Sequence, residues 1–258
     1  MKFFYLVVST FLCLNVAAAK EYKVLVQDFL PLAGRNGRGK FTGAHVELTE
    51  AVCKKLKFDC KFELVAIRVG EEMMSKGEAD VFVGLSPNAD RKKIAYFSPM
   101  LTTSAYTFFV KKGKASKYAS VTDLAGTTVG VYGPSATSRS LDAIHEKANK
   151  NFKVEQEAIL ETSFKKLDTN AYGEKSLVYS NKPVGQYMTK ILSLTIEPLS
   201  FDTEKINHGV MLSKKSFSSD DYKKVWSAYK EVMDSDEGKR IYAFWHLEPY
   251  SGQAETAP

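Results

Sequence analysis

The segment Gly77–Ser98 reads GEADVFVGLSPNADRKKIAYFS, and the fold of the whole chain can be predicted outward from it. Its residues 80–84 (DVFVG) form a short apolar run of the kind found in a buried parallel strand. The small polar residues that follow, Pro87 among them, end that strand. Arg91 then opens a short basic turn. We interpret the segment as a carboxylate site, because a guanidinium meets a carboxylate in two parallel hydrogen bonds.

The same segment has a second interpretation. It can be a plain strand-to-helix turn in which Arg91 is only solvated by water. In the binding interpretation, exposed backbone N–H groups, the Ser86 hydroxyl and the Arg91 guanidinium converge on one anion. Spacing alone does not separate the two.

The first 19 residues have the features of a cleavable secretory signal peptide. Lys2 supplies a positive charge, an apolar run extends from Phe3 to Leu14, and alanines at 17–19 offer a small-residue cleavage site. This run is too short to span a bilayer. We therefore expect a soluble mature protein that begins near Lys20 and enters an oxidising compartment.

Removal of that segment would leave two cysteines, Cys53 and Cys60. In an oxidising compartment such a pair is most simply a disulfide. A zinc site is not expected, since the four histidines, at 45, 145, 208 and 246, show no ligand spacing. We predict neither a metal nor a cofactor.

Length and charge indicate how many lobes the chain has and which kind of partner is not expected. A mature chain of about 240 residues suits two lobes of about 100 to 120 residues each. The hydrophobic content of 44% is enough for real cores, and the net charge of +6 is spread along the chain. No basic run is interleaved with aromatic residues, so nucleic acid is not an expected partner.

Strands and helices alternate in the first hundred residues. We expect, in order, a strand at 22–26, a helix at 44–56, a strand at 60–66, a helix at 71–76 and a strand at 80–84. This order predicts a parallel sheet with helices on both faces. Ligands of such sheets bind beyond the carboxyl ends of the strands, which is where Phe29, Gly84, Ser86 and Arg91 lie.

A second α/β pattern follows an extended, aromatic-rich segment at 103–111, which we expect to cross out of the first lobe. Strands are expected at 128–132, 152–156, 176–180 and 208–214, and helices at 121–125, 136–147, 163–167, 184–191 and from 219 onward. Ser135 can cap the helix 136–147, whose N-terminus would present free N–H groups to an anion. Residues 251–258 are expected to form a flexible tail.

The order and spacing of these segments resemble those of periplasmic solute-binding proteins of the polar amino-acid type, which are family 3 of the bacterial extracellular solute-binding proteins. Residues 42–56 are similar to that family's glycine-aromatic-acidic helix signature, although Ala44-His45 replaces the usual aromatic-acidic pair. The loop from Gly84 to Arg91 resembles its carboxylate-binding loop. Residues 129–131 resemble the start of its second lobe, and 238–245 its closing segment.

The resemblance implies a two-lobed α/β fold of the type II periplasmic-binding-protein class. Each lobe would be a mostly parallel sheet flanked by helices, and two crossover segments would join the lobes. Lobe 1 would comprise 20–109 and 205–250, and lobe 2 would comprise 112–200. Cys53 and Cys60 occupy the positions at which the histidine- and lysine/arginine/ornithine-binding members carry a disulfide.

The resemblance also implies a set of ligand-binding residues. Arg91 would bind an α-carboxylate, and Ser86 and the Gly84 carbonyl would bind an α-ammonium. Phe29 would stack on the ligand. From lobe 2, the turn at Ser135 would add N–H groups and a hydroxyl to the carboxylate.

Two departures from the family pattern bear on the ligand. Pro134-Ser135-Ala136 stands where the family has Gly-Thr followed by Thr or Ser, so one hydroxyl is lost unless Thr137 replaces it. Asn181 stands where the family has an acidic residue for the ammonium, and a neutral amide does not balance a buried cation. We therefore expect a carboxylate that lacks an ammonium, or a modified amino acid, in place of an ordinary α-amino acid.

The function that the resemblance implies is transport. Two lobes would close on a small carboxylate-bearing solute, and the monomeric periplasmic protein would deliver it to an inner-membrane ABC permease. One alternative is an enzyme similar to cyclohexadienyl dehydratases, which needs a general acid in the cleft; Glu161 and Glu174 are the candidates. Another is the ligand-binding component of a sensory system. We expect no enzymatic activity.

Overall fold

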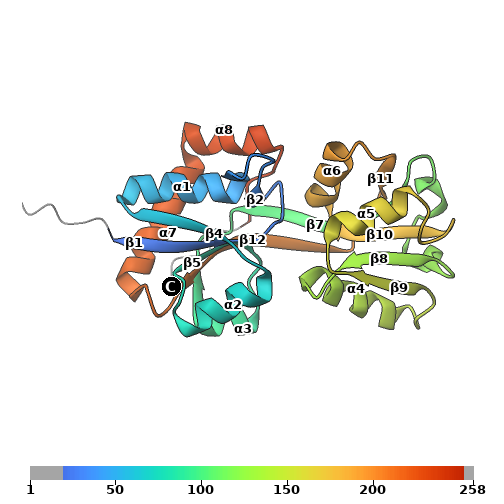
Figure 1. The fold of residues 1–258 in the computed structure, drawn as a ribbon, viewed down its shortest axis with the longest axis horizontal. Coiled ribbons are helices and arrows are strands. Elements are labelled where there is room, and N and C mark those ends of the chain that lie inside the picture. The colour runs from blue at the N-terminus through green and yellow to red at the C-terminus, as the bar shows by residue number, and fades with distance from the viewer. Residues whose placement is uncertain (1–19, 253–258) are drawn as a thin grey trace, which may run out of the picture.

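The computed structural model describes residues 20–252. The expected signal peptide at 1–19 and most of the expected tail at 251–258 therefore lie outside the described residues. Within 20–252 the chain forms two α/β lobes that lie side by side (Figure 1). Two long strands, β7 (Thr102–Lys111) and β12 (Glu204–Ser213), run from one lobe into the other.

Lobe 1 is a sheet in the order β4-β1-β5-β12, covered by helices on both faces. Its parallel strands are β1 (Glu21–Val26), β4 (Asp59–Leu64) and β5 (Val81–Leu85), and β12 lies antiparallel to β5. One face packs against α1 (Ala44–Leu56), α7 (Ser219–Asp234) and α8 (Asp236–Trp245). The other face packs against α2 (Ile67–Lys76) and α3 (Ala89–Ile94).

The alternation of side chains along each strand explains why both faces carry helices. Val24 and Val26 of β1 join the core beneath α1 and α7, whereas Leu25 joins the core above α2. Successive residues of a strand point to opposite faces, so a strand buried on both sides is apolar throughout. The predicted parallel sheet is confirmed in this lobe.

Lobe 2 repeats the arrangement. Its parallel strands are β8 (Thr128–Tyr132), β9 (Lys153–Glu157) and β10 (Ser176–Asn181), and β7 and β11 (Ile196–Pro198) complete the sheet. One face packs against α4 (Ala136–Lys147), and the other against α5 (Leu160–Asp168) and α6 (Lys182–Ile191). The short elements are β2 (Gly34–Arg35), β3 (Phe41–Thr42), β6 (Ala95–Phe97) and the 3₁₀ helices η1 (Ala115–Lys117) and η2 (Val121–Leu124).

The two crossover strands are shared between the lobes. Residues 204–208 of β12 pair with the start of β7, whereas its residues 209–212 pair with β5 of lobe 1. The second half of β7 pairs with β10 of lobe 2. The expected pair of crossover segments is therefore present, and it forms a short antiparallel ribbon between the two bodies.

Several element boundaries differ from those expected. Helix α2 begins at Ile67, one turn before the expected start, and the expected basic turn at Arg91 is the helix α3. The Asn88 side chain accepts a hydrogen bond from Arg91 N at 2.8 Å and so caps α3. Strand β12 begins at Glu204 instead of residue 208, because its polar first half pairs with β7 and buries little apolar surface.

The predicted disulfide is present. It joins Cys53 near the end of α1 to Cys60 at the start of β4, with the two Cα atoms 6.3 Å apart. Strand β4 is the edge strand of the lobe 1 sheet, so the disulfide ties this edge to the helix that covers it. Over residues 20–252, no helix combines the length and the apolar character that crossing a membrane requires.

Candidate ligand-binding cleft

A small cavity of about 30 Å³ lies between the lobes, where the strand ends of both sheets meet. Lobe 1 contributes residues that follow β1 and β5, and lobe 2 contributes the end of β8 and the start of α4. Its lining residues are Gln27, Phe29, Ile67, Gly84, Leu85, Ser86, Arg91, Tyr106, Tyr132, Ser135, Ala136, Thr137 and His208. The structure thus brings together every predicted site residue except Asn181.

Arg91 is held from two sides. Its Nε donates to Glu71 Oε1 at 2.7 Å, and its Nη1 donates to the Ser86 carbonyl oxygen at 2.6 Å. The side chain is only 4% exposed, so the interpretation of Arg91 as a solvated turn residue is wrong. Among residues 20–252, Nη2 has no hydrogen-bond partner, and this edge of the guanidinium is left for the cavity.

The lobe 2 wall of the cavity is the first turn of α4. Ser135 caps this helix as expected, but its polar groups are occupied there: Oγ accepts from Ser138 N at 3.1 Å, and Ser135 N donates to Ser138 Oγ at 3.0 Å. The hydroxyl also donates to the Tyr132 carbonyl oxygen at 2.8 Å. The amides of Ala136 and Thr137 have no partner in the described part of the chain. They are the N–H groups that the helix start offers to an anion.

Of the groups expected to bind an ammonium, the Gly84 carbonyl is engaged elsewhere. The Gly84 carbonyl oxygen accepts from Gln27 Nε2 at 2.8 Å. Asn181 is fully buried and does not line the cavity; its Nδ2 donates to Ser104 Oγ at 2.5 Å, and its Oδ1 has no partner among the described residues. Contact between Asn181 and a ligand stays a prediction. None of the cavity's lining residues is an aspartate or a glutamate.

Two histidines lie beside the cavity. The His208 ring lies 6.0 Å from the Phe29 ring and 6.4 Å from the His45 ring, measured between centroids. The pKa of each imidazole is lowered to about 3, chiefly by burial; His208 adds to the lowering for His45, and Arg91 adds to it for His208. Both rings are therefore neutral at physiological pH, and Arg91 carries the positive charge of the cavity. The described residues contain no group of three or more metal-binding side chains.

Sequence reasoning missed several of the lining residues. Tyr132 is the last residue of a strand that was predicted correctly, so the rule that selected Phe29 would also have selected it. His208 lies inside β12, and the late start assigned to that strand hid its place in the cleft. Gln27 donates a hydrogen bond to the Gly84 carbonyl, and Glu71 accepts one from Arg91. No sequence pattern predicts such contacts.

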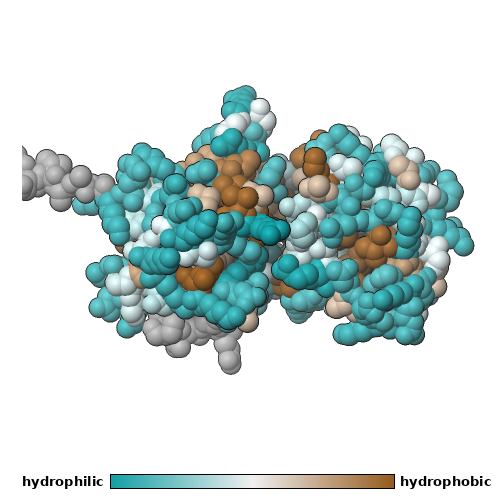
Figure 2. Space-filling model, turned by 60° about the horizontal axis from the view of Figure 1, so that its bottom comes forward, coloured by the Kyte–Doolittle hydropathy of each residue, from teal (hydrophilic) through white to brown (hydrophobic). Residues whose placement is uncertain are grey.

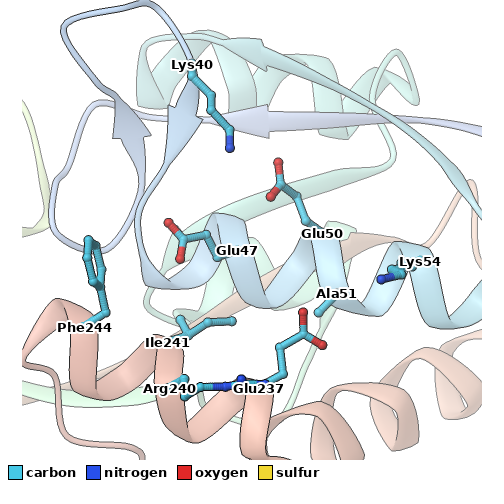
Figure 3. Close-up of a pocket in the computed structure, with 9 residues that line it drawn as sticks. All are labelled: Lys40, Glu47, Glu50, Ala51, Lys54, Glu237, Arg240, Ile241 and Phe244. Carbon is cyan, nitrogen blue, oxygen red and sulfur yellow. The ribbon is translucent and has the colours of Figure 1, made fainter.

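On the face shown in Figure 2, mostly hydrophilic residues lie where the two lobes meet. A groove lined mostly by polar and charged residues borders the cavity at Arg91. It has a volume of about 680 Å³ and reaches from Arg91 of lobe 1 to Arg139 of α4 in lobe 2. A separate cavity of about 560 Å³ lies on the outer side of lobe 1, where α8 faces α1 (Figure 3). Its wall mixes Lys40 and Arg240 with the glutamates at 47, 50 and 237, and it contains no lobe 2 residue. The cleft at Arg91, by contrast, offers a solute contacts with both lobes.

The two candidate general acids lie outside the small cavity. Glu161 pairs with Lys165 on α5, and Glu174 pairs with Lys114 at 3.2 Å. Each carboxylate therefore already has a cationic partner.

The model of the bacterial extracellular solute-binding proteins, family 3, matches residues 23–248. The chain belongs to this family. A curated relative, the arginine-binding periplasmic protein of Mannheimia haemolytica, is 23% identical over 245 residues, which cover 90% of this chain and 94% of the relative.

Solved structures show the same fold. An ancestral arginine-binding protein bound to arginine superposes with a TM-score of 0.74 at 23% identity, over 87% of this chain and 97% of that one. A histidine kinase sensor domain similar to periplasmic binding proteins gives a TM-score of 0.75 at 17% identity, over 90% and 98%. The two-lobed, type II periplasmic-binding-protein fold is therefore confirmed.

Proposed function

We propose that this family 3 protein is the periplasmic substrate-binding component of an ABC transporter, and that it binds a small carboxylate-bearing solute between its lobes. One observation carries the proposal. The free edge of the Arg91 guanidinium and the open N–H groups of α4 line the same cavity from opposite lobes. A carboxylate there meets a positive charge from lobe 1 and a helix N-terminus from lobe 2.

A ligand that binds both lobes favours their closure. A solute that contacts Arg91 alone would leave the lobes free to separate, whereas a solute that also contacts Ala136 and Thr137 favours the closed arrangement. The ribbon of β7 and β12 serves as the hinge. Lobe 1 comprises 20–109 and 205–250, and lobe 2 comprises 112–200.

The other parts of the proposal follow from this role. The protein is a monomer, it reaches the periplasm by a cleavable signal peptide, and its closed form is recognised by an inner-membrane permease. Phe29 stacks on the solute, and Ser86 and Thr137 supply hydroxyls. The neutral Asn181 and the engaged Gly84 carbonyl favour a solute without an α-ammonium, because neither supplies a negative charge.

A sensory role is the second candidate, and the fold shared with a histidine kinase sensor domain favours it. Such a protein would use the same closed form to bind a signalling receptor. An enzymatic role has less support, since the cavity wall contains no carboxylate to act as a general acid.

The test is truncation of Arg91, with a ligand found by a thermal-shift screen of small carboxylates and amino acids. Arg91→Ala should weaken binding at least about 100-fold, or about 2.7 kcal/mol, because the ligand's charge is left unpaired in a desolvated cleft. Arg91→Lys should also bind poorly, since an ammonium does not reproduce the guanidinium fork. Isothermal titration measures each affinity.

Arg240→Ala on α8 is the matched control, because it removes the same charge outside the cleft. A melting curve for each variant separates binding from folding, since Arg91→Ala also leaves Glu71 without its partner. Parent-like binding by Arg91→Ala would place the anchor elsewhere, with Arg68 the next candidate. If Arg91→Ala does not fold, Arg91→Lys decides: parent-like affinity there would contradict the proposed role.

A further inference from the structure

His208 brings a polar ring atom to the cavity that contains Arg91. The residue lies on β12 where this strand passes between the lobes, and it lines the cavity although it is only 4% exposed. Among the described residues its Nε2 has no hydrogen-bond partner, and unlike His45 Nδ1 it is not a completely buried atom. We therefore take Nε2 to face the space between the lobes.

The other ring nitrogen of His208 lies at the end of a chain of polar groups. Its Nδ1 is 3.5 Å from Ser104 Oγ on the facing strand β7, and the same Oγ accepts from Asn181 Nδ2 at 2.5 Å. The Ser104 hydroxyl hydrogen is thus free to point at His208 Nδ1 or at the Ile206 carbonyl oxygen, each 3.5 Å away. In the first arrangement Nδ1 accepts, so the proton of the neutral ring lies on Nε2. In the second arrangement the proton lies on Nδ1.

The charges around the ring favour the first arrangement once a solute is bound. Burial and the nearby Arg91 guanidinium both lower the pKa of His208, so the ring stays neutral and a second cation beside it is disfavoured. None of the cavity's lining residues is an aspartate or a glutamate that could offset such a cation. An oxygen of the solute is suited to this position, and it needs the N–H form of Nε2.

The neighbouring residues limit where that oxygen is attached. Gly84 and Ser86, which are expected beside the α-substituent of an amino acid, line the same small cavity as His208. With the solute's carboxylate on Arg91, a substituent in this space is bonded to carbon 2 of the acid. The Gly84 carbonyl already accepts from Gln27, so an ammonium at carbon 2 would lack an acceptor that a hydroxyl or keto oxygen does not need.

We propose that His208 is a specificity-determining residue that donates a hydrogen bond from Nε2 to an oxygen on carbon 2 of the solute. The preferred ligands are then 2-hydroxy and 2-oxo carboxylates, and 2-amino acids are poorer. This inference rests on the proposed function, since it takes Arg91 as the carboxylate anchor.

The experiment uses matched sets of acids with three, four and five carbons. Each set contains the unsubstituted carboxylate and its 2-hydroxy, 2-oxo and 2-amino derivatives, and isothermal titration measures each affinity. For the wild-type protein at the best chain length, the 2-hydroxy or the 2-oxo acid should bind at least about tenfold tighter than the unsubstituted and the 2-amino acids. This comparison needs no variant to fold.

His208→Phe keeps an aromatic ring and removes the N–H group. It should abolish the preference for the oxygenated acids and leave the affinity for the unsubstituted acid unaffected. His246→Gln is the control, because it removes an imidazole at an exposed position outside the cavity, and its affinities should equal those of the wild type.

A second measurement locates the proton directly. In protein whose histidines carry isotope-labelled nitrogen, the NMR shifts of the two His208 ring nitrogens distinguish N–H from bare nitrogen. The complex with the preferred acid should show the proton on Nε2, a result that a merely structural role for the ring would not require. A proton on Nδ1 in that complex would overturn the inference.

The titrations also separate this inference from the function on which it rests. The inference is overturned if the wild type binds the oxygenated acids no better than the unsubstituted or the 2-amino acids, or if His208→Phe keeps the preference. If the unsubstituted carboxylates bind through Arg91 without any preference, only this inference fails. If no carboxylate binds, the proposed function fails with it.

Discussion

At the scale of single residues, the candidate site depends on buried polar side chains that hold one another in place. Arg91 is positioned by Glu71 and by the Ser86 carbonyl before any ligand arrives. An arginine with part of its fork already occupied presents its remaining edge in one orientation. Less conformational entropy is then lost when a carboxylate binds.

The neutral histidines beside the cavity lead to a prediction about pH. His45 and His208 have a pKa of about 3 in the fold, against an ordinary value of 6.5 in the unfolded chain. Between these values the unfolded chain binds more protons, so the free energy of unfolding falls as the pH drops from 6.5 toward 3. Above 6.5 the two states bind equally few protons at these sites, and no effect is expected.

Each histidine should account for up to about 2 kcal/mol of the stability lost between pH 7 and pH 5. Denaturant unfolding at the two pH values measures this loss. His45→Gln and His208→Gln should each reduce it, because glutamine keeps a hydrogen-bonding amide and does not titrate. His246→Gln, at an exposed position, is the control. Equal pH dependence in all four proteins would mean that the buried rings are not the cause.

The sequence predicted which residues lie at the strand ends, but it did not predict their hydrogen-bond partners. Phe29, Gly84, Ser86 and Arg91 were selected because parallel strands place their carboxyl ends at one edge, a rule that needs no coordinates. The burial of Arg91 could not be predicted, since it depends on Glu71, twenty residues earlier, turning toward it. The occupied hydroxyl of Ser135 was missed for a similar reason: Ser138 completes the cap.

At the scale of elements, apolar periodicity predicted most of the helices and strands, and polar segments caused the errors. Helix α2 has only Gly70 and Met74 buried, and the apolar Ile67 and Val69 of its first turn do not mark a buried face of the helix. The polar first half of β12 also lacks an apolar pattern and was therefore expected to be loop, although its backbone pairs with that of β7. The strands with both faces buried, such as β5, were placed within one residue.

The disulfide between α1 and β4 should contribute measurably to the stability of lobe 1. A cross-link that closes so short a loop is worth about 2 to 3 kcal/mol, chiefly by restricting the unfolded chain. Cys53→Ser with Cys60→Ser should lower the free energy of unfolding by this amount, as measured with denaturant. Adding reductant should lower the wild type to the level of the double variant and leave the variant unchanged. Two free thiols in the unfolded, unreduced wild type would contradict the pairing.

At the scale of the whole molecule, an aromatic contact bridges the lobes away from the hinge. Tyr187 of α6 in lobe 2 and Trp245 of α8 in lobe 1 have ring centroids 6.3 Å apart, within the range of an aromatic pair. The second tryptophan of the chain, Trp226, packs against the lobe 1 core. Trp245 is therefore a natural reporter of the distance between the lobes.

Ligand binding should change the fluorescence of Trp245 and make the protein more compact. The change should persist in Trp226→Phe and disappear in Trp245→Phe. Tyr187→Ala removes a contact worth about 1 kcal/mol to the closed form, so ligand affinity should fall by about fivefold. Small-angle scattering provides an independent measure. A radius of gyration that does not decrease at saturation would contradict closure.

The shared strand β12 has a further consequence for how the chain is made. Lobe 2 lies within one continuous stretch, but lobe 1 is split, and its strand β5 pairs with β12 across more than a hundred residues of sequence. When residues 20–200 have emerged from the ribosome, all of lobe 2 and only the first part of lobe 1 are available to fold. Until β12 and α7 emerge, β5 has an unpaired edge and Val81 and Val83 lack the partners that cover them. The lobe that is begun first is thus the one completed last, and during translation its sheet edge is open to any chaperone that binds extended polypeptide.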